Sequence, residues 1–400
     1  MKFKVTVVSL LLVSVNLVNA QETSSSKFGN GVFNVVGQDS SWTMKIGARM
    51  QFLTIASWEN NKGELINGEA AFSVRRARLK FGGYALTPKL KYKIELGLSN
   101  RDMAGASVYT SDTPRFILDA VMQWNFYKNF ELWFGQAKLP GNRDRLISSG
   151  SLQFVDRSIL NAEFNIDRDL GFQLRHHFNL TDQFVIREAI AISQGEGRNV
   201  TTGNIGGLQY TGRLELLPLG LFPDKGDYIG GAINRHESAK LSIGVSYNFN
   251  NNAVKTKSNQ GSYMITDSGY YKTNITTLFI DTMFKHKGFS FMGEYANRDA
   301  EDPIAKNDDG TPTGQIVQVG SALNLQAGYL FKSNWEVASR FSNVDFNSIV
   351  SNENTVNEYT LGISKYIVGH KLKVQSDFTY IDTEHLNSRL AYRLQFEVHF

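Results

Sequence analysis

Residues 391–400 of the chain read AYRLQFEVHF. Apolar and polar side chains alternate here without a break, and a two-residue period is the mark of a β-strand with one apolar and one polar face. The apolar set is Tyr392, Leu394, Phe396, Val398 and Phe400, and the polar set is Arg393, Gln395, Glu397 and His399. The terminal strand of an open soluble sheet tends to fray. The stretch therefore favours a sheet in which the last strand is held on both sides.

The same alternation recurs along most of the chain. In residues 42–52, WTMKIGARMQF, one parity carries Trp42, Met44 and Phe52, and the other carries Lys45 and Arg49. Counting every such stretch predicts sixteen strands. They are expected near 42–52, 77–85, 90–98, 116–126, 130–138, 168–178, 184–193, 208–217, 240–249, 276–285, 289–298, 322–330, 335–343, 358–367, 371–381 and 389–400.

The connections between these strands alternate in length. The short ones are 85–89, 127–129, 179–183, 286–288, 331–334 and 368–370, and long polar loops lie between them. One connection, 218–239, is long where a short turn is due, and the pattern does not explain it. Short turns at one end, long loops at the other and strands of about ten residues predict an all-β fold, an antiparallel transmembrane β-barrel. Closure satisfies every backbone polar group by pairing the last strand with the first.

Two soluble all-β folds compete with the barrel. A β-sandwich gives the same parity, because it also has one buried and one solvated face. A propeller would show a repeat of about 40 residues, and none is found. Aromatic residues at the strand ends favour the barrel, since they match the girdles of a membrane interface. These residues are Trp42, Trp58, Trp124, Tyr127, Phe130 and Trp335.

The first residues have the features of a secretory signal peptide. Lys2 and Lys4 precede an apolar stretch that ends in small residues at Ala20. That stretch is shorter than the ~20 residues a spanning helix needs. We therefore expect a signal peptide at 1–20, a periplasmic segment at 21–41 and the barrel domain at 42–400.

Composition narrows the function further. The chain has no cysteine, which excludes disulfides and thiolate sites, and its 42 basic and 38 acidic residues nearly cancel. Nucleic acid is therefore not expected as a partner. No Ser–His–acid constellation is found, so an enzyme is not expected. No metal or cofactor is expected either, and the acidic loop 299–309 is interpreted as solvated, with calcium as the open alternative.

A sixteen-stranded barrel is wide enough to leave an aqueous channel. On the inward parity of the first three strands and the last one, cations outnumber acids. Such a basic wall raises the local concentration of anions, although the alternative is that these charges only keep the wall hydrated. Its members are Lys45, Arg49, Arg76, Arg78, Lys80, Lys91, Lys93, Arg389 and Arg393.

The longest loop, residues 139–167, mixes apolar residues with basic ones. Its apolar content predicts that it folds inward and constricts the channel. The alternative is a surface loop with no part in flux. The basic residues expected at this constriction are Lys138, Arg143, Arg145 and Arg157.

Four stretches of the chain resemble the phosphate-selective porin O/P family. They are FSVRRARLKFGGYALTPKLKYKIELGLS at 72–99, WFGQAKLPGNRDRLISSGSLQFVDRSIL at 133–160, LELLPLGLFPDKGDY at 214–228 and FKHKGFSFMGEYANR at 284–298. The resemblance implies a sixteen-stranded outer-membrane barrel, commonly trimeric, whose basic wall and inward loop pass phosphate or polyphosphate. It also implies a long segment after the eighth strand.

We therefore expect a porin of the bacterial outer membrane that lets small hydrophilic solutes, anions above all, diffuse passively. Its expected partners are outer-membrane lipid and lipopolysaccharide, small anionic solutes, two further copies in a homotrimer, and the barrel-assembly machinery, for which Phe400 would be the signal. The alternative is a binding or adhesion barrel whose long loops capture a glycan or a partner.

Overall fold

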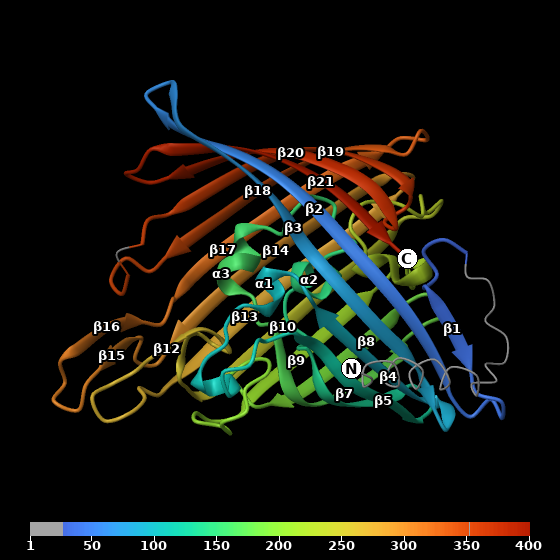
Figure 1. The fold of residues 1–400 in the computed structure, drawn as a ribbon, viewed down its shortest axis with the longest axis horizontal. Coiled ribbons are helices and arrows are strands. Elements are labelled where there is room, and N and C mark those ends of the chain that lie inside the picture. The colour runs from blue at the N-terminus through green and yellow to red at the C-terminus, as the bar shows by residue number, and fades with distance from the viewer. Residues whose placement is uncertain (1–26, 352) are drawn as a thin grey trace, which may run out of the picture.

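A computed structural model describes residues 27–351 and 353–400. The expected signal peptide lies outside the described residues. Strands dominate the fold, and sixteen of them follow one another around a single ring (Figure 1). These are β2 (Thr43–Asn61), β3 (Glu64–Ala85), β4 (Thr87–Gly97), β5 (Ile117–Tyr127), β6 (Phe130–Lys138), β7 (Arg168–Asn179), β8 (Val185–Ser193), β9 (Gln209–Leu217), β10 (Lys240–Ala253), β13 (Thr273–His286), β14 (Phe289–Ala300), β17 (Gly320–Leu330), β18 (Trp335–Phe346), β19 (Val356–Val368), β20 (Leu372–Thr383) and β21 (Ser388–His399).

The ring is closed by the first and last of these strands. β2 pairs with β21 in antiparallel register from Arg49 opposite His399 to Asn60 opposite Ser388. All other neighbouring strands in the ring are also antiparallel. The predicted sixteen-stranded antiparallel barrel is confirmed, and the final strand has a partner on each side.

Alternation in the sequence separates the inside of the barrel from the outside. On β2, Gln51 is fully buried, whereas the next side chain, Phe52, is 45% exposed. Ile94 and Phe396 are likewise exposed on the outer face, and Arg78 is buried inside. The apolar parity therefore faces outward, where a bilayer lies in barrels of this kind, and the polar parity faces the lumen.

The first hairpin differs from the prediction. The expected long loop between residues 52 and 77 is wrong, because β2 and β3 continue as paired strands of 19 and 22 residues that meet at Lys62 and Gly63. The pairing of β2 with β21 supports this extension almost to its tip. The hairpin therefore projects beyond the rest of the wall, at the upper left of Figure 1.

The remaining elements are short. Strand β1 (Phe33–Val36) pairs with β2 at Thr43–Ile46, so part of the segment expected at 21–41 joins the sheet. The others are β11 (Lys255–Lys257), β12 (Gln260–Tyr263), β15 (Ile304–Lys306), β16 (Pro312–Ile316), α1 (Asn100–Met103), α2 (Arg143–Leu146), α3 (Ile159–Phe164), η1 (Val108–Thr110) and η2 (Pro223–Tyr228). Within the described part of the chain, no helix has the length and apolarity needed to cross a membrane.

Candidate functional site: the lumen

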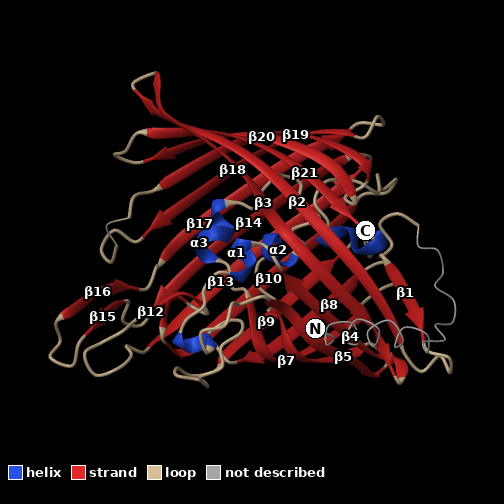
Figure 2. Ribbon diagram, viewed as in Figure 1, coloured by secondary structure: helices blue, strands red, loops and turns tan. Residues whose placement is uncertain are grey.

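The loop between β6 and β7 lies inside the barrel. Its two short helices, α2 and α3, are enclosed by the strands in Figure 2. Leu160, Phe164 and Ile166 are fully buried against inward side chains such as Phe279 and Ala296. Apolar residues of the loop thus replace water against the far wall, because burying them there is favourable.

The middle of this loop is hydrogen-bonded to two separate parts of the wall. Ser149 Oγ accepts a hydrogen bond from Arg49 Nη2 at 2.8 Å, so Arg49 is covered by the loop. Gln153 Nε2 donates to Glu336 Oε1 at 2.9 Å on β18. The loop therefore crosses the lumen from β6 to the β18 and β2 sides.

Arg143, in α2, lies in a buried acidic part of the wall. Its Nε donates to Asp281 Oδ1 at 2.7 Å, and its Nη2 lies 3.3 Å from Glu215 Oε1. Burial alone would lower the pKa of Arg143, but Asp281 and Glu215 outweigh burial and raise it. Arg143 is fully buried and does not line open space.

The unexplained connection 218–239 also folds inward, from the turn end. Gly230 N donates to Ser151 O at 2.6 Å, which joins this segment to the inward loop. The hydroxyl of Tyr228 donates to Glu215 Oε2 at 2.6 Å. Lys285 Nζ donates to two of the segment's backbone carbonyls. The segment is therefore part of the lumen and not a surface turn.

Together these two segments confine the open lumen to one side. A cavity of about 980 Å³ lies between them and the wall from β3 to β9. Fifteen of its lining residues are basic and nine are acidic. The basic ones are Arg76, Arg78, Lys80, Lys93, Arg101, Lys138, Arg145, Arg157, Arg168, Arg175, Arg187, Arg198, Arg213, Lys225 and Arg393. The cavity is therefore positively charged, although the whole chain is nearly neutral.

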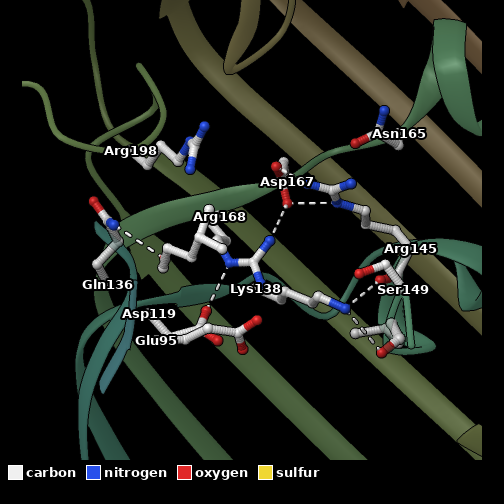
Figure 3. Close-up of polar contacts among 12 residues, drawn as sticks. Glu95, Asp119, Gln136, Lys138, Arg145, Ser149, Asn165, Asp167, Arg168 and Arg198 are labelled. Carbon is white, nitrogen blue, oxygen red and sulfur yellow. Dashed lines mark hydrogen bonds and ion pairs between the residues drawn. The ribbon is translucent and has the colours of Figure 1, made fainter. Parts of the chain in front are cut away.

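An unbroken network of alternating charges follows the cavity wall. Arg78 makes two hydrogen bonds of 2.8 Å to Asp102 and lies 3.1 Å from Glu95. Lys93 then bridges Glu95 and Asp119. From Asp119 the network continues through Arg168 and Asp167 to Arg145, as Figure 3 shows. Each cation is held in place by an acid, which fixes the geometry of the wall.

Five of the fifteen cations have no carboxylate oxygen within 4.0 Å in the described part of the chain. Lys138 Nζ instead donates to the backbone carbonyls of Arg145, Leu146 and Ile147. Arg198 Nη2 donates to Asp102 O. No carboxylate of the described residues therefore neutralises these charges directly. The five are Arg101, Lys138, Arg175, Arg198 and Lys225.

Only some of the basic residues predicted from the sequence line the cavity. Of the basic wall, Arg76, Arg78, Lys80, Lys93 and Arg393 line the cavity. Lys45, Lys91 and Arg389 are exposed residues outside the cavity lining. Of the loop set, Lys138, Arg145 and Arg157 line the cavity, whereas Arg143 does not.

Arg75 is a lumen residue that the alternation missed. A β-bulge leaves it unpaired, because Gln51 lies opposite Arg76 while Phe52 lies opposite Val74. Arg75 and Arg76 consequently both turn inward and pair with Asp156 of the loop. The two adjacent arginines interrupt the alternation of the strand, and this interruption is the feature of the sequence that indicates the bulge.

A family model that covers most of the chain identifies the family. A model of the family described as phosphate-selective porin O and P matches residues 56–396. The chain belongs to this family. It is therefore a channel of the bacterial outer membrane and not an enzyme. No curated protein matches this porin by sequence.

Solved structures of outer-membrane proteins share the fold of this porin. OmpT of Vibrio cholerae is 11% identical, with a TM-score of 0.53 over 91% of this chain and 100% of that one. The anion-selective porin from Comamonas acidovorans is 11% identical, with a TM-score of 0.53 over 90% and 100%. The channel DcaP of Acinetobacter baumannii is 11% identical, with a TM-score of 0.54 over 90% and 99%.

The loop cations of the porin are electrostatically crowded. Burial lowers the pKa of Arg157 to about 10, and the neighbouring Asp144 opposes this shift. Burial, together with Arg157 and Arg168, holds the pKa of Arg145 well below its usual range. A guanidinium with a pKa of about 10 is still charged at neutral pH, so Arg157 presents positive charge to the lumen.

Proposed function

We propose that this porin favours anions, including phosphate-like ones, over cations of similar size. The observation that carries the proposal is the excess of basic over acidic residues along a cavity that follows only one side of the barrel. Rows of Arg and Lys attract anions and lower the cost of removing part of their hydration shell. The neighbour titled an anion-selective porin supports the same direction by analogy of fold.

The unpaired cations have a distinct role in this proposal. Charges that are already neutralised by acids hold the wall together, whereas Arg101, Lys138, Arg175, Arg198 and Lys225 act on the solute. Arg101 and Arg198 lie near the loop end, Lys138 beside the inward loop, and Arg175 and Lys225 toward the turn end. An anion would thus meet an uncompensated positive charge at each stage of its passage.

The porin is also proposed to assemble as a homotrimer in outer-membrane lipid. One neighbouring structure, OmpT of Vibrio cholerae, carries the words trimer form in its title. We also propose that the barrel-assembly machinery binds Phe400, the last residue, which is 41% exposed.

Reversal potentials across a planar bilayer test the anion preference. The purified porin is placed between unequal concentrations of potassium chloride and then of potassium phosphate. We expect the sign of the reversal potential to report preferential anion flux in both salts. A potential of the opposite sign would refute the preference while leaving the channel intact. Absence of any conductance would instead favour a binding barrel.

A further inference from the structure

Trp133 is an unusual residue for the wall of a hydrophilic channel. It lies on β6 opposite Gln123 and Gln173, which are lumen residues, whereas the next residue, Phe134, lies opposite Met122 and Phe172 on the outer face. Trp133 lines the cavity and is partly exposed there. Its Nε1 donates to Glu131 Oε2 at 3.0 Å, but its apolar ring gains nothing from contact with water.

A guanidinium lies over this indole. The Cζ atom of Arg175, on the neighbouring strand β7, is 4.1 Å from the centre of the Trp133 ring. Gln173 Oε1 accepts hydrogen bonds from Arg175 Nε at 3.2 Å and Nη2 at 2.7 Å. The Nε2 of Gln173 donates to Lys138 O at 2.9 Å, so the group that orients Arg175 is fixed at both ends.

Arg175 has hydrogen-bonding capacity to spare. A guanidinium has five N–H donors, and two of them bond to Gln173. In the described part of the chain the side chain of Arg175 makes no other hydrogen bond and no ion pair with a carboxylate. The side chain of Arg175 lines the same cavity as the indole of Trp133. The arrangement combines a charged edge with apolar surface.

We propose that Trp133 and Arg175 form a binding seat for organic anions that carry an aromatic ring next to a carboxylate. A hydrated inorganic ion gains nothing from the indole. An aromatic carboxylate pairs its oxygens with the free N–H donors of Arg175 and stacks its ring against the apolar surface, as small-molecule sites generally combine the two. The proposal rests on the anion preference argued above and names a solute class that this channel would retain longest.

Block of the chloride current tests the seat, with benzoate and acetate as probes of equal charge. The full-length porin is studied in planar bilayers, and each carboxylate is titrated while single-channel chloride conductance is recorded. We expect benzoate to reach half-block at about one-tenth of the acetate concentration. Equal half-block by the two anions would overturn the proposal.

Variants locate the seat. Trp133→Ala should raise the benzoate half-block concentration about five- to tenfold while the potassium chloride reversal potential stays unchanged. Arg175→Gln should raise it similarly, and Trp133→Phe should restore most of the block. The matched control is Phe134→Ala, which removes an aromatic ring from the outer face of the same strand. Its benzoate block should equal that of the wild type.

The reversal potential recorded on the same channels separates this proposal from the one on which it rests. An anion-selective wild type in which Trp133→Ala leaves benzoate block unchanged would refute the seat alone. A cation-selective wild type would refute both. Conductance of each variant shows that its barrel has assembled.

Discussion

Arg143 and Asp281 form a fully buried ion pair between the inward loop and strand β13, with 2.7 Å between Nε and Oδ1. Arg213 donates to the same carboxylate from β9, and Glu215 lies beside both arginines. The loop is thus attached to the wall by charge as well as by apolar contacts. An unpaired charge left at such a site is costly, whereas the complete set is not.

Replacement of Arg143 by Met should release the loop. The change leaves Asp281 and Glu215 buried with one cation fewer, which costs about 3–5 kcal/mol of the free energy that holds the loop in place. Single-channel recordings should show a noisier current. Lys225→Met, which removes a cavity cation without a carboxylate partner, is the control and should leave the noise unchanged. A quiet Arg143→Met channel would show that apolar packing alone holds the loop.

Asp156 should keep the loop attached in moderately acidic solution. Burial would raise the pKa of this carboxyl, but Arg75 and Arg76 outweigh burial and hold the pKa well below its usual value of 3.8. A depressed folded-state pKa means that its stabilising effect is complete above pH ~4 and is lost only as the pH falls through the lower, folded value.

The difference in conductance between the wild type and Asp156→Asn should accordingly stay constant between pH 7 and pH 4, because the other titratable groups of the lumen are common to both channels. Asp156→Asn removes the ionisable group, so Arg75 and Arg76 lose their partner and the conductance at pH 7 should differ from that of the wild type. A difference that disappears between pH 7 and pH 5 would contradict the assignment, because Asp156 stays ionised in the wild type throughout that range.

Replacement of Arg76, Arg78 and Lys80 by Gln should reduce the anion preference without unfolding the barrel, since lumen residues tune selectivity. Arg78→Gln alone should act more strongly than Lys80→Gln, because Arg78 compensates both Glu95 and Asp102. Reversal potentials measured on the two single variants show which change reduces the anion preference more. Equal effects of the two single changes would show that the acids do not influence the passing ion.

Leu79 lies between these lumen residues in sequence but on the outer parity of β3. Leu79→Lys should impair insertion, because a lysine on the lipid face near the bilayer midplane costs about 2–4 kcal/mol. The yield of heat-modifiable barrel in folding assays measures this cost. Ala77→Leu, on the same face, is the control and should insert normally. Normal insertion of Leu79→Lys would place this part of β3 outside the hydrocarbon region.

Shortening the connection 218–239 to a tight turn should widen the lumen at the turn end. The segment occupies that end through Asp227, Tyr228 and Gly230, and its loss leaves Arg187 without the partner Asp227. Conductance in potassium chloride should rise. Replacing only the exposed tip residue Lys225 by Ala keeps the segment and should raise it little. An unchanged conductance after shortening would mean that the inward loop alone limits flow.

The sequence predicts the strands well, because each one must turn alternate side chains to lipid and to water, and this requirement repeats every two residues. It fails where the rule is broken locally. Arg75 turns inward only because a bulge breaks the register, and the extension of β2 and β3 over residues 53–76 lies outside the stretches whose alternation predicts strands. Arg143 lies in a loop whose path across the lumen depends on contacts with distant strands such as β13.

The path of the connection 218–239 is another feature that the sequence alone does not predict. Nothing in a row of residues such as PDKGDY shows that it enters a barrel from the turn end, because Tyr228 finds Glu215 and Gly230 finds Ser151 only after the ring has closed. Trp133 could be placed in the lumen by parity, but its contact with Arg175 needs the register of β6 against β7.

Because the cavity lies on one side, the inner wall has a closely packed half and a half that lines open space. Inward residues of β10, β13, β14 and β17, such as Ser246, Thr277 and Asn324, are packed as tightly as the interior of a folded domain. A single added methylene there is expected to be felt throughout the fold. Inward residues from β3 to β8 line the cavity, so during evolution changes in this half can alter the cargo while the other half preserves the architecture.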